Sequence, residues 1–330
     1  MIIGMDYAVI EESFESLISC WADSNHRLMW NPVFVLPAWL KVWWQEFNPE
    51  AEPYLVTIRR EGEIIGIAPL LIKEGRASII GSADVCDYLD FVVADGKEEE
   101  FFNTLLDDLG EKGVKHLDLG SLRPDSTVLT SLVGIAVKRG YEVLCQPEDV
   151  SLEIDLPASW EEYLATLSKK QRHEVRRKLR RLWETGKVEY RCSNSNHLNE
   201  DFMDTFLKLF ALSRQEKAGF MTARRESFFR SLAKAMAEIG LLRFGILEID
   251  KQPVAMTMGF DYGDTIYLYN SAYDPQFNSL SVGVLCKTLC IQESIKAGKK
   301  RFDLLKGNEI YKYHLGGREV PLSRCQITAR

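Results

Sequence analysis

Residues 266–285, IYLYNSAYDPQFNSLSVGVL, carry the clearest indication of the fold. A β-rich run ends at Tyr273-Asp274-Pro275, a polar loop follows, and a helix is expected to begin near Ser281 with Gly283 in its first turn. The first turn of a helix leaves N–H groups without partners and carries the positive end of the helix dipole, which suits a pyrophosphate. A glycine there lets a ligand approach the backbone closely. The pattern also fits an ordinary capped helix, because Ser279 and Ser281 are both good N-caps.

Outward from this stretch, the C-terminal half predicts helices that precede antiparallel strands and then a strand–helix–strand unit. The helices are expected at 160–167, 169–184, 199–217, 225–239 and 282–297, and the strands at 242–249, 254–260, 265–272, 301–304 and 322–328. The N-terminal half repeats this order. Its helices are expected at 11–22, 37–44, 98–112 and 127–139, and its strands at 54–59, 63–72, 77–80, 88–93, 114–119 and 142–144.

This order of elements predicts an α/β (α+β) chain of two domains, 1–150 and 151–330, each with a mixed, largely antiparallel sheet flanked by helices. A length of 330 residues also exceeds what a single compact core usually supports. The two halves differ in charge: residues 1–150 carry 12 Lys+Arg against 26 Asp+Glu (net −14), and residues 151–330 carry 29 against 22 (net +7). We therefore expect a phosphate-bearing ligand in the second half.

The cysteines and the apolar runs bear on the compartment. Seven cysteines without paired spacing argue against a disulfide framework and favour a reducing compartment. No apolar run approaches the roughly 20 residues of a membrane span, and the N-terminus lacks the positive start of a secretory signal. We expect a cytoplasmic protein. No metal-ligand spacing is found, so no metal is expected.

A run of cations marks the predicted helix 169–184. Val175, Leu179 and Leu182 form an apolar stripe on it, which leaves the cations on the remaining surface. These cations are Lys169, Lys170, Arg172, Arg176, Arg177, Lys178, Arg180 and Arg181. A solvated amphipathic helix and an anion site for the phosphate of a small ligand, a lipid-linked phosphate or a tRNA both explain the pattern. Sequence-specific DNA binding is disfavoured, because no helix-turn-helix or zinc motif occurs.

Two clusters contain candidates for chemistry. Glu309, Tyr311, Lys312 and His314 follow the strand 301–304 in a glycine-rich segment, where alternate positions would share a face if the segment is extended. In the first half, Asp84, Asp87 and Asp90 surround Tyr88, and a buried aspartate there could act as a base with a raised pKa. A polar loop and strand-end capping by Asp are the alternatives for the two clusters.

Several segments resemble the GNAT-type acetyltransferase domain of the CelD-like, FemAB-related group. The pieces are Trp160-Glu-Glu-Tyr-Leu with Leu167-Ser-Lys-Lys-Gln-Arg172, the helix 176–181, the segment from Tyr273-Asp274 to Gly283, and Phe302-Asp303-Leu-Leu-Lys-Gly307 with Tyr311-Lys-Tyr-His-Leu-Gly316. Pro37-Ala-Trp39 and Asp87-Tyr88-Leu89-Asp90 look like that group's first domain. The resemblance implies two GNAT-like domains in tandem. The first would serve the acceptor and the second the acyl donor, with the acceptor in the cleft between them.

The resemblance implies an acyltransferase that moves an acetyl or acyl group from acyl-CoA to an amine or hydroxyl of a small molecule, polysaccharide or cell-envelope precursor. The expected donor-binding residues are Ser279, Ser281, Val282, Gly283, Val284 and Arg172. The expected substrate-binding residues are Asp87, Tyr88, Tyr273, Asp274 and Lys312, and the expected catalytic residues are Asp90, Glu309, Tyr311 and His314. The sequence has one glycine where the usual GNAT phosphate loop has two. A FemAB-type ligase that uses aminoacyl-tRNA and a non-catalytic anion-binding module therefore remain alternatives.

Overall fold

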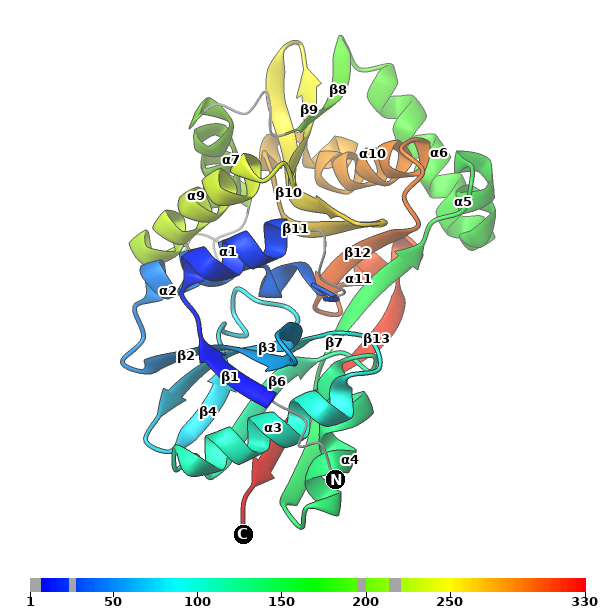
Figure 1. Cartoon of the computed structure of the whole chain (residues 1–330). Coiled ribbons are helices and arrows are strands. Elements are labelled where there is room, and N and C mark those ends of the chain that lie inside the picture. The colour runs from blue at the N-terminus through cyan, green and yellow to red at the C-terminus, as the bar shows by residue number, and fades with distance from the viewer. Residues whose placement is uncertain (1–6, 24–27, 195–199, 214–220) are drawn as a thin grey trace. The chain divides into compact units, whose positions relative to one another are not determined.

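The computed structural model describes residues 7–23, 28–194, 200–213 and 221–330 (Figure 1). The chain forms two compact units: unit 1 contains Met1–Asp149 with Val320–Arg330, and unit 2 contains Val150–Glu319. The division made from the sequence assigned all of 151–330 to the second domain. The end of the chain instead belongs to unit 1, because its last strand pairs with a strand of the N-terminal half.

The sheet of unit 1 has the strand order β1-β2-β3-β4-β6-β13-β7, with β5 paired to β3. The strands are β1 (Tyr7–Glu11), β2 (Glu52–Arg60), β3 (Glu63–Lys73), β4 (Arg76–Ile79), β5 (Val92–Val93), β6 (His116–Leu122), β7 (Glu142–Asp155) and β13 (Arg318–Thr328). The predicted hairpin is confirmed: β2 and β3 are joined by Glu61-Gly62, both with positive φ. The expected strand at 142–144 is the beginning of a much longer one.

Helices cover both faces of this sheet, with α1 and α2 on one face and α3 and α4 on the other (Figure 1). They are α1 (Phe14–Ala22), η1 (Val33–Val35), α2 (Pro37–Phe47), α3 (Glu98–Glu111), η2 (Val128–Leu132, a π-helix) and α4 (Val133–Lys138). The first helix begins later than predicted, because β1 pairs with β2 and Ser13 forms a capping box with Ser16. Aromatic side chains such as Phe34, Trp39 and Phe101 are fully buried between the layers.

The sheet of unit 2 has the order β7-β12-β11-β10-β9-β8, and all its neighbours are antiparallel except β11 and β12. The strands are β8 (Val188–Asn194), β9 (Leu242–Ile249), β10 (Gln252–Tyr262), β11 (Thr265–Tyr273) and β12 (Arg301–Lys306). The edge strand β8 was not predicted, although Val188, Tyr190 and Cys192 alternate with charged residues as in a half-buried strand.

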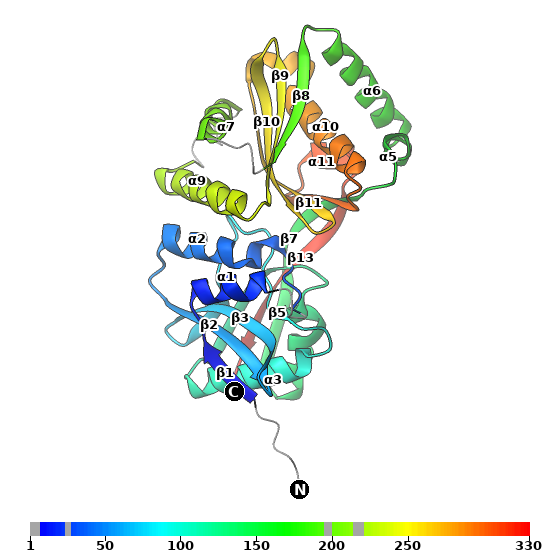
Figure 2. The same ribbon diagram turned by 45° about the horizontal axis from the view of Figure 1, so that its top comes forward.

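Helices also cover both faces of the unit 2 sheet: α7 and α9 lie on one side of β8–β10, and α6 and α10 on the other (Figure 2). The helices are α5 (Trp160–Thr166), α6 (Lys169–Trp183), α7 (Glu200–Ser213), α9 (Ala223–Glu238), η4 (Pro275–Leu280, a 3-10 helix), α10 (Val282–Lys296) and α11 (Ile310–His314). The predicted end of the helix 199–217, residues 214–217, lies outside the described residues. None of the described helices combines the length and apolar composition needed to cross a membrane.

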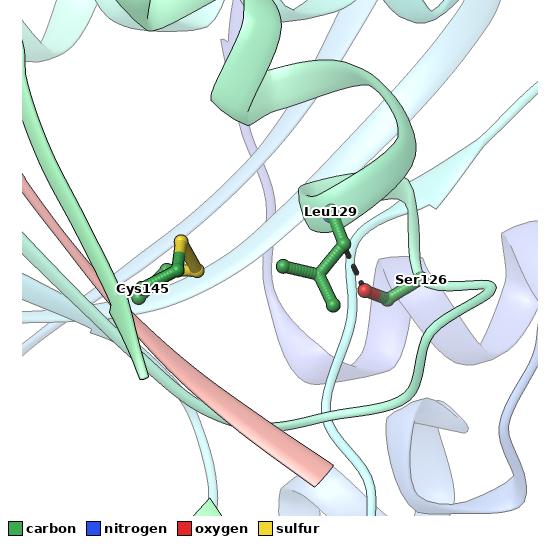
Figure 3. Close-up of a disulfide and its surroundings, with 4 residues drawn as sticks. Ser126, Leu129 and Cys145 are labelled. Carbon is green, nitrogen blue, oxygen red and sulfur yellow. Dashed lines mark hydrogen bonds between the residues drawn. A yellow bond between two sulfur atoms is a disulfide. The ribbon is translucent and has the colours of Figure 1, made fainter. Parts of the chain in front are cut away.

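One disulfide is present, although the seven cysteines without paired spacing argued against a disulfide framework. Cys145 on β7 and Cys325 on β13 are bonded, with their Cα atoms 4.1 Å apart (Figure 3). Spacing along the sequence could not indicate this pair, because 180 residues separate its members and only the strand pairing of unit 1 brings them together. The other cysteines are free: Cys20, Cys86, Cys192, Cys286 and Cys290.

Candidate functional site

The candidate site lies where two parallel strands of unit 2 separate. β11 and β12 pair only at Thr265↔Arg301, Ile266↔Phe302 and Tyr267↔Asp303. Beyond Tyr267, β11 continues along β10 as far as Ala255↔Tyr273, whereas β12 continues along β7. β11 therefore has β12 as a neighbour only in its first three residues, 265–267. After the last residue of β11, Tyr273, the chain continues directly into η4 and α10.

The bend of β12 away from β11 is built into the backbone. The register of β12 against β7 shifts between Asp303 and Lys306, and Leu305 between them has φ +61°, a value that residues other than glycine rarely adopt. The Asp303 carboxylate accepts the N–H of Leu305 at 2.8 Å. A bulge of this kind redirects a strand, so it accounts for the separation of β12 from β11.

Lys312 holds this bend from the inside. Its ammonium donates to the carbonyl oxygens of Leu305 at 3.0 Å, Lys306 at 2.5 Å and Gly307 at 3.1 Å, and it pairs with Glu309 at 3.0 Å. The residue is only 2% exposed. These contacts occupy the three donors of an ammonium group, so Lys312 is bound by its own unit in this structure, and its substrate role stays a prediction.

The loop between β11 and α10 is ordered by its own polar groups. Asp274 is buried, and its carboxylate accepts the N–H of Gln276 at 2.9 Å at the start of η4. The hydroxyl of Ser213 on α7 accepts the N–H of Tyr273 at 2.7 Å and lies 2.9 Å from the Tyr273 carbonyl oxygen. The predicted substrate ligands Tyr273 and Asp274 thus help to build the loop.

The start of α10 has no side-chain cap. Ser281 occupies the N-cap position with φ +57° and ψ +35°, and its hydroxyl makes no capping hydrogen bond. Its carbonyl oxygen accepts the N–H groups of Val284 and Leu285, both at 3.0 Å. Among the described residues, no hydrogen-bond acceptor meets the N–H of Val282 or of Gly283. These amides lie at the positive end of a 15-residue helix, the arrangement that attracts an anion.

Gly283 has a packing role as well. A Cβ atom at this position would lie 2.8 Å from Cδ1 of Tyr273, so the Tyr273 ring lies against the glycine backbone. Any larger residue would displace that ring. A substitution such as Gly283→Glu is therefore expected to disturb the packing of Tyr273 as well as the start of α10.

A second buried lysine connects α10 with α11. Lys287, 5% exposed, donates from its ammonium to the Gly283 carbonyl oxygen at 3.0 Å. The same ammonium lies 4.7 Å from the centre of the Tyr311 ring, a cation–π contact. Sequence reasoning missed Lys287, although a lysine four residues after Gly283 inside an apolar run was a usable signal.

The other candidates after β12 lie on a short helix and not on an extended segment. Glu309 precedes α11 and is exposed, Tyr311 is half-buried against α10, and His314 is exposed. The condition under which positions 309, 311 and 313 would share a face, an extended segment, is not met, because residues 310–314 form the helix α11. Among the predicted catalytic residues in unit 2, Tyr311 contacts α10 through the Lys287 ammonium.

Only some of the cations of the basic helix α6 form ion pairs with carboxylates of unit 2. Arg176 pairs with Glu161, and Arg177 and Lys178 pair with Glu174. The hydrogen bond from Arg177 lowers the pKa of Glu174 to about 2. Arg180 lies 4.0 Å from Glu184. Within the described residues no ion pair is formed by the remaining cations, Lys169, Lys170, Arg172 and Arg181.

The unit 1 candidates are mostly buried. Asp90 accepts the N–H of Phe91 at 2.9 Å, and the N–H and the hydroxyl of Thr127 at 2.7 Å each. Burial raises the pKa of Asp90 to about 7. Tyr88 is buried beneath the Arg123 guanidinium, 5.0 Å from its ring centre, and Asp87 is half-buried. Asp90 thus caps the entry to η2, a structural role that differs from the strand-end capping considered from the sequence. The described residues contain no group of three or more His, Cys, Asp or Glu arranged to hold a metal ion.

Comparisons with known proteins identify a family domain in unit 2 and relatives of the fold. Residues 169–313, which include α6, the diverging strands and α10, match the family model described as "Acetyltransferase (GNAT) domain". No curated protein matches the chain. Among solved structures, FemX shares the fold with a TM-score of 0.66 at 12% identity over 96% of both chains.

Two further structures share the fold. A conserved protein of unknown function from Bacteroides thetaiotaomicron has a TM-score of 0.59 at 12% identity, over 98% of this chain and 100% of that one. The C-terminal domain of a putative lysylphosphatidylglycerol synthetase from Agrobacterium fabrum has a TM-score of 0.55 at 10% identity, over 80% and 81%. The predicted likeness to a GNAT domain is confirmed for residues 169–313, and the mixed α/β fold predicted from the sequence is confirmed as well. The fold shared with FemX extends through both units.

Proposed function

Because residues 169–313 form an acetyltransferase (GNAT) domain, we propose that the protein transfers an acyl group from acyl-CoA to an amine or hydroxyl acceptor. The acceptor classes that we propose are small molecules, polysaccharides and cell-envelope precursors. The proposed compartment is the cytoplasm, where a CoA thioester is available to the enzyme.

The observation that carries the proposal is the uncapped start of α10 at the separation of β11 and β12. The free amides of Val282 and Gly283, with Ser279, Ser281 and Val284 around them, would receive the CoA pyrophosphate. Arg172, which has no ion pair among the described residues, would add a positive charge for a phosphate. The extended arm of acyl-CoA carries amide groups. These would hydrogen-bond to the backbone of β11 beyond Tyr267, where β12 no longer pairs with it.

The proposed reaction is direct attack by the acceptor on the thioester carbonyl. The nucleophile loses a proton, its lone pair forms the new C–N or C–O bond, and the C–S bond breaks to release the thiolate, which takes a proton. Tyr311 is the proposed proton donor, because it is the candidate hydroxyl that packs on α10. Glu309 and His314 are the proposed bases, since both are exposed and follow the same strand. The acceptor role of Asp87, Tyr88 and Asp90 remains a proposal for unit 1.

One observation favours a second donor. The four cations of α6 that lack ion pairs would also suit the backbone of an aminoacyl-tRNA or a lipid-linked phosphate. An aminoacyl-tRNA donor, and an anion-binding module without catalysis, are therefore kept as alternatives.

A pair of variants at Ser281 tests the donor site. Asn and Asp both tolerate the left-handed backbone of Ser281 and have the same shape, but Asp places a negative charge beside the free amides. We expect Ser281→Asn to bind acetyl-CoA nearly as the unmodified protein does, and Ser281→Asp to bind about tenfold more weakly by like-charge repulsion. Titration calorimetry measures the affinities, and circular dichroism shows whether both variants fold.

The outcomes separate the hypotheses. Equal acetyl-CoA affinity in the two folded variants would mean that the start of α10 does not bind the donor. Absence of acetyl-CoA and longer acyl-CoA binding, with tRNA binding intact, would replace the acyl-CoA donor with an aminoacyl-tRNA. Acyl-CoA binding without turnover of any acceptor would leave the non-catalytic module.

A further inference from the structure

A cysteine and a buried arginine meet on the sheet face that α10 covers. Cys192 lies on β8 and Arg243 on β9, and the register Cys192↔Gly245 and Asn194↔Arg243 makes them neighbours across the two strands. The Arg243 Nη2 group donates to the Cys192 sulfur at 3.4 Å. Arg243 is 7% exposed, whereas Cys192 is half-buried, so part of this residue is open to solvent.

The guanidinium of Arg243 has a donor without a partner. Its Nε atom is buried and makes no hydrogen bond. The N–H groups of Nε and Nη2 are parallel and form a fork that matches two adjacent acceptor atoms. In this structure one arm of the fork meets the Cys192 sulfur and the other meets nothing among the described residues. Since sulfur is a weak acceptor, even the occupied arm is poorly satisfied.

The charge of Arg243 is also incompletely balanced. The nearest carboxylate with a described ion pair to it is Asp261, whose oxygen lies 3.9 Å from Nη1. Asp261 in addition makes a close ion pair with Lys299. One partly exposed carboxylate is thus shared by two cations. A buried guanidinium in such a position favours a further negative group on the side that faces Cys192.

The absence of a side chain at Gly245 leaves room for two hydroxyl groups next to Cys192 and Arg243. A Cβ atom there would lie 2.5 Å from the hydroxyl oxygens of both Tyr190 and Thr257, so these hydroxyls fill the volume that a side chain would take. The Tyr190 hydroxyl lies 3.5 Å from the Cys192 sulfur. Cys192 therefore faces a guanidinium and a phenol on this side of the sheet.

We propose that Cys192 is a site of reversible oxidation by hydroperoxides, and that the Arg243 fork binds the resulting sulfenate. The Cys192 thiolate would attack one peroxide oxygen, so that an S–O bond forms and the O–O bond breaks. Sulfur loses two electrons, and the departing alkoxide or hydroxide takes a proton to become an alcohol or water. The product S–O⁻ supplies two adjacent acceptor atoms, and its oxygen would meet the vacant Nε–H while its sulfur stays at Nη2.

The experiment uses another cysteine of the same chain as an internal control. Cys20 on α1 is also half-buried, but burial and the nearby Glu12 raise its pKa, which disfavours its reactive thiolate. The full chain is treated with hydrogen peroxide in the presence of dimedone, and the adduct at each cysteine is measured by peptide mass spectrometry. We expect the adduct at Cys192 to form about tenfold faster than the one at Cys20.

Two arginine variants test the role of the fork. Arg243→Lys keeps a cation but removes the paired donors, and we expect it to slow adduct formation at Cys192 several-fold. Arg191→Lys is the matched control: Arg191 is next to Cys192 on β8, faces the other side of the sheet and pairs with Glu248 at 2.9 Å. It should leave the rate unchanged.

Two results would overturn the proposal: an adduct at Cys192 that forms no faster than at Cys20, or equal rates in Arg243→Lys and Arg191→Lys. If Arg243→Lys does not fold, the ratio of the Cys192 and Cys20 rates in the unmodified chain still decides.

Discussion

The N–H groups at the starts of two helices in this chain, η2 and α10, are treated in opposite ways. At the entry to η2 in unit 1, the buried Asp90 carboxylate accepts the N–H and the hydroxyl of Thr127. At the entry to α10 in unit 2, Ser281 makes no side-chain cap, and the Val282 and Gly283 amides have no acceptor among the described residues. A helix start that is closed by its own carboxylate contributes to stability and has no place for an anion. An open start forgoes that stability and remains available for a ligand.

The comparison extends to the two buried polar clusters beside these helices. Around Asp90 and around Lys312, each charged group is surrounded by backbone groups of its own unit. Variants there should therefore change the free energy of unfolding, whereas variants at the open start of α10 should change ligand affinity with little effect on stability.

The largest effect is expected from Lys312→Met. Methionine fills most of the volume but leaves the carbonyl oxygens of Leu305, Lys306 and Gly307 without their donor. We expect a loss of about 3 kcal/mol in the free energy of unfolding, measured by urea denaturation. Lys300→Met, at an exposed lysine, should change it by no more than about 0.5 kcal/mol. Equal stabilities of the two variants would mean that Lys312 does not hold β12.

Asp90→Ala should have the next largest effect. It removes the acceptor of three hydrogen bonds in a buried place, and we expect a loss of about 2 kcal/mol in the free energy of unfolding. The half-buried Asp87 provides the control, since Asp87→Ala should cost clearly less. If Asp90→Ala abolished acyl transfer while the free energy of unfolding stayed the same, Asp90 would be a catalytic group and not a cap.

The pH dependence of stability gives a smaller and independent measure of the closed start. Burial raises the pKa of Asp90 in the folded state to about 7 from an ordinary value of 3.8. Between these values the unfolded chain releases a proton that the folded chain retains, so stability falls as the pH rises from about 4 to about 7 and is level above that. The slope should be about 1 kcal/mol per pH unit near the middle. In Asp90→Asn this contribution should vanish, and an unchanged slope would assign it to other groups.

The difference between the two helix starts also explains what the sequence could predict. The hairpin of β2 and β3, and the run from β11 into α10, were predictable because alternation, turn residues and cap residues lie within a few positions of each other. Whether Asp90 or Ser281 actually caps a helix was not predictable. Asp90 reaches Thr127, which is 37 residues away, whereas Ser281 has a positive φ and makes no side-chain capping hydrogen bond.

The surroundings of the candidate functional residues also depend on contacts that the sequence alone does not show. Lys312 was expected at a substrate, but a bulge at Leu305 turns three carbonyl oxygens toward it. The disulfide Cys145–Cys325 and the contact of Lys287 with Tyr311 depend on pairs that are distant in sequence. Only a motif whose parts lie within one strand–loop–helix segment, such as residues 266–285, could be recognised without the fold.

The smallest effect is expected from Arg172→Gln on α6. Arg172 has no ion pair among the described residues, so its loss should leave the free energy of unfolding within about 0.5 kcal/mol of the unmodified value. If its charge assists a donor phosphate, acetyl-CoA affinity should fall by a few-fold at low salt, and the difference should shrink as salt is added because exposed charges are screened. Arg177→Gln is the matched control, because Glu174 already pairs with that guanidinium. A salt-independent loss, or an equal loss in both variants, would place the donor phosphate away from Arg172 and leave the free amides of α10 as the donor's contact in this domain.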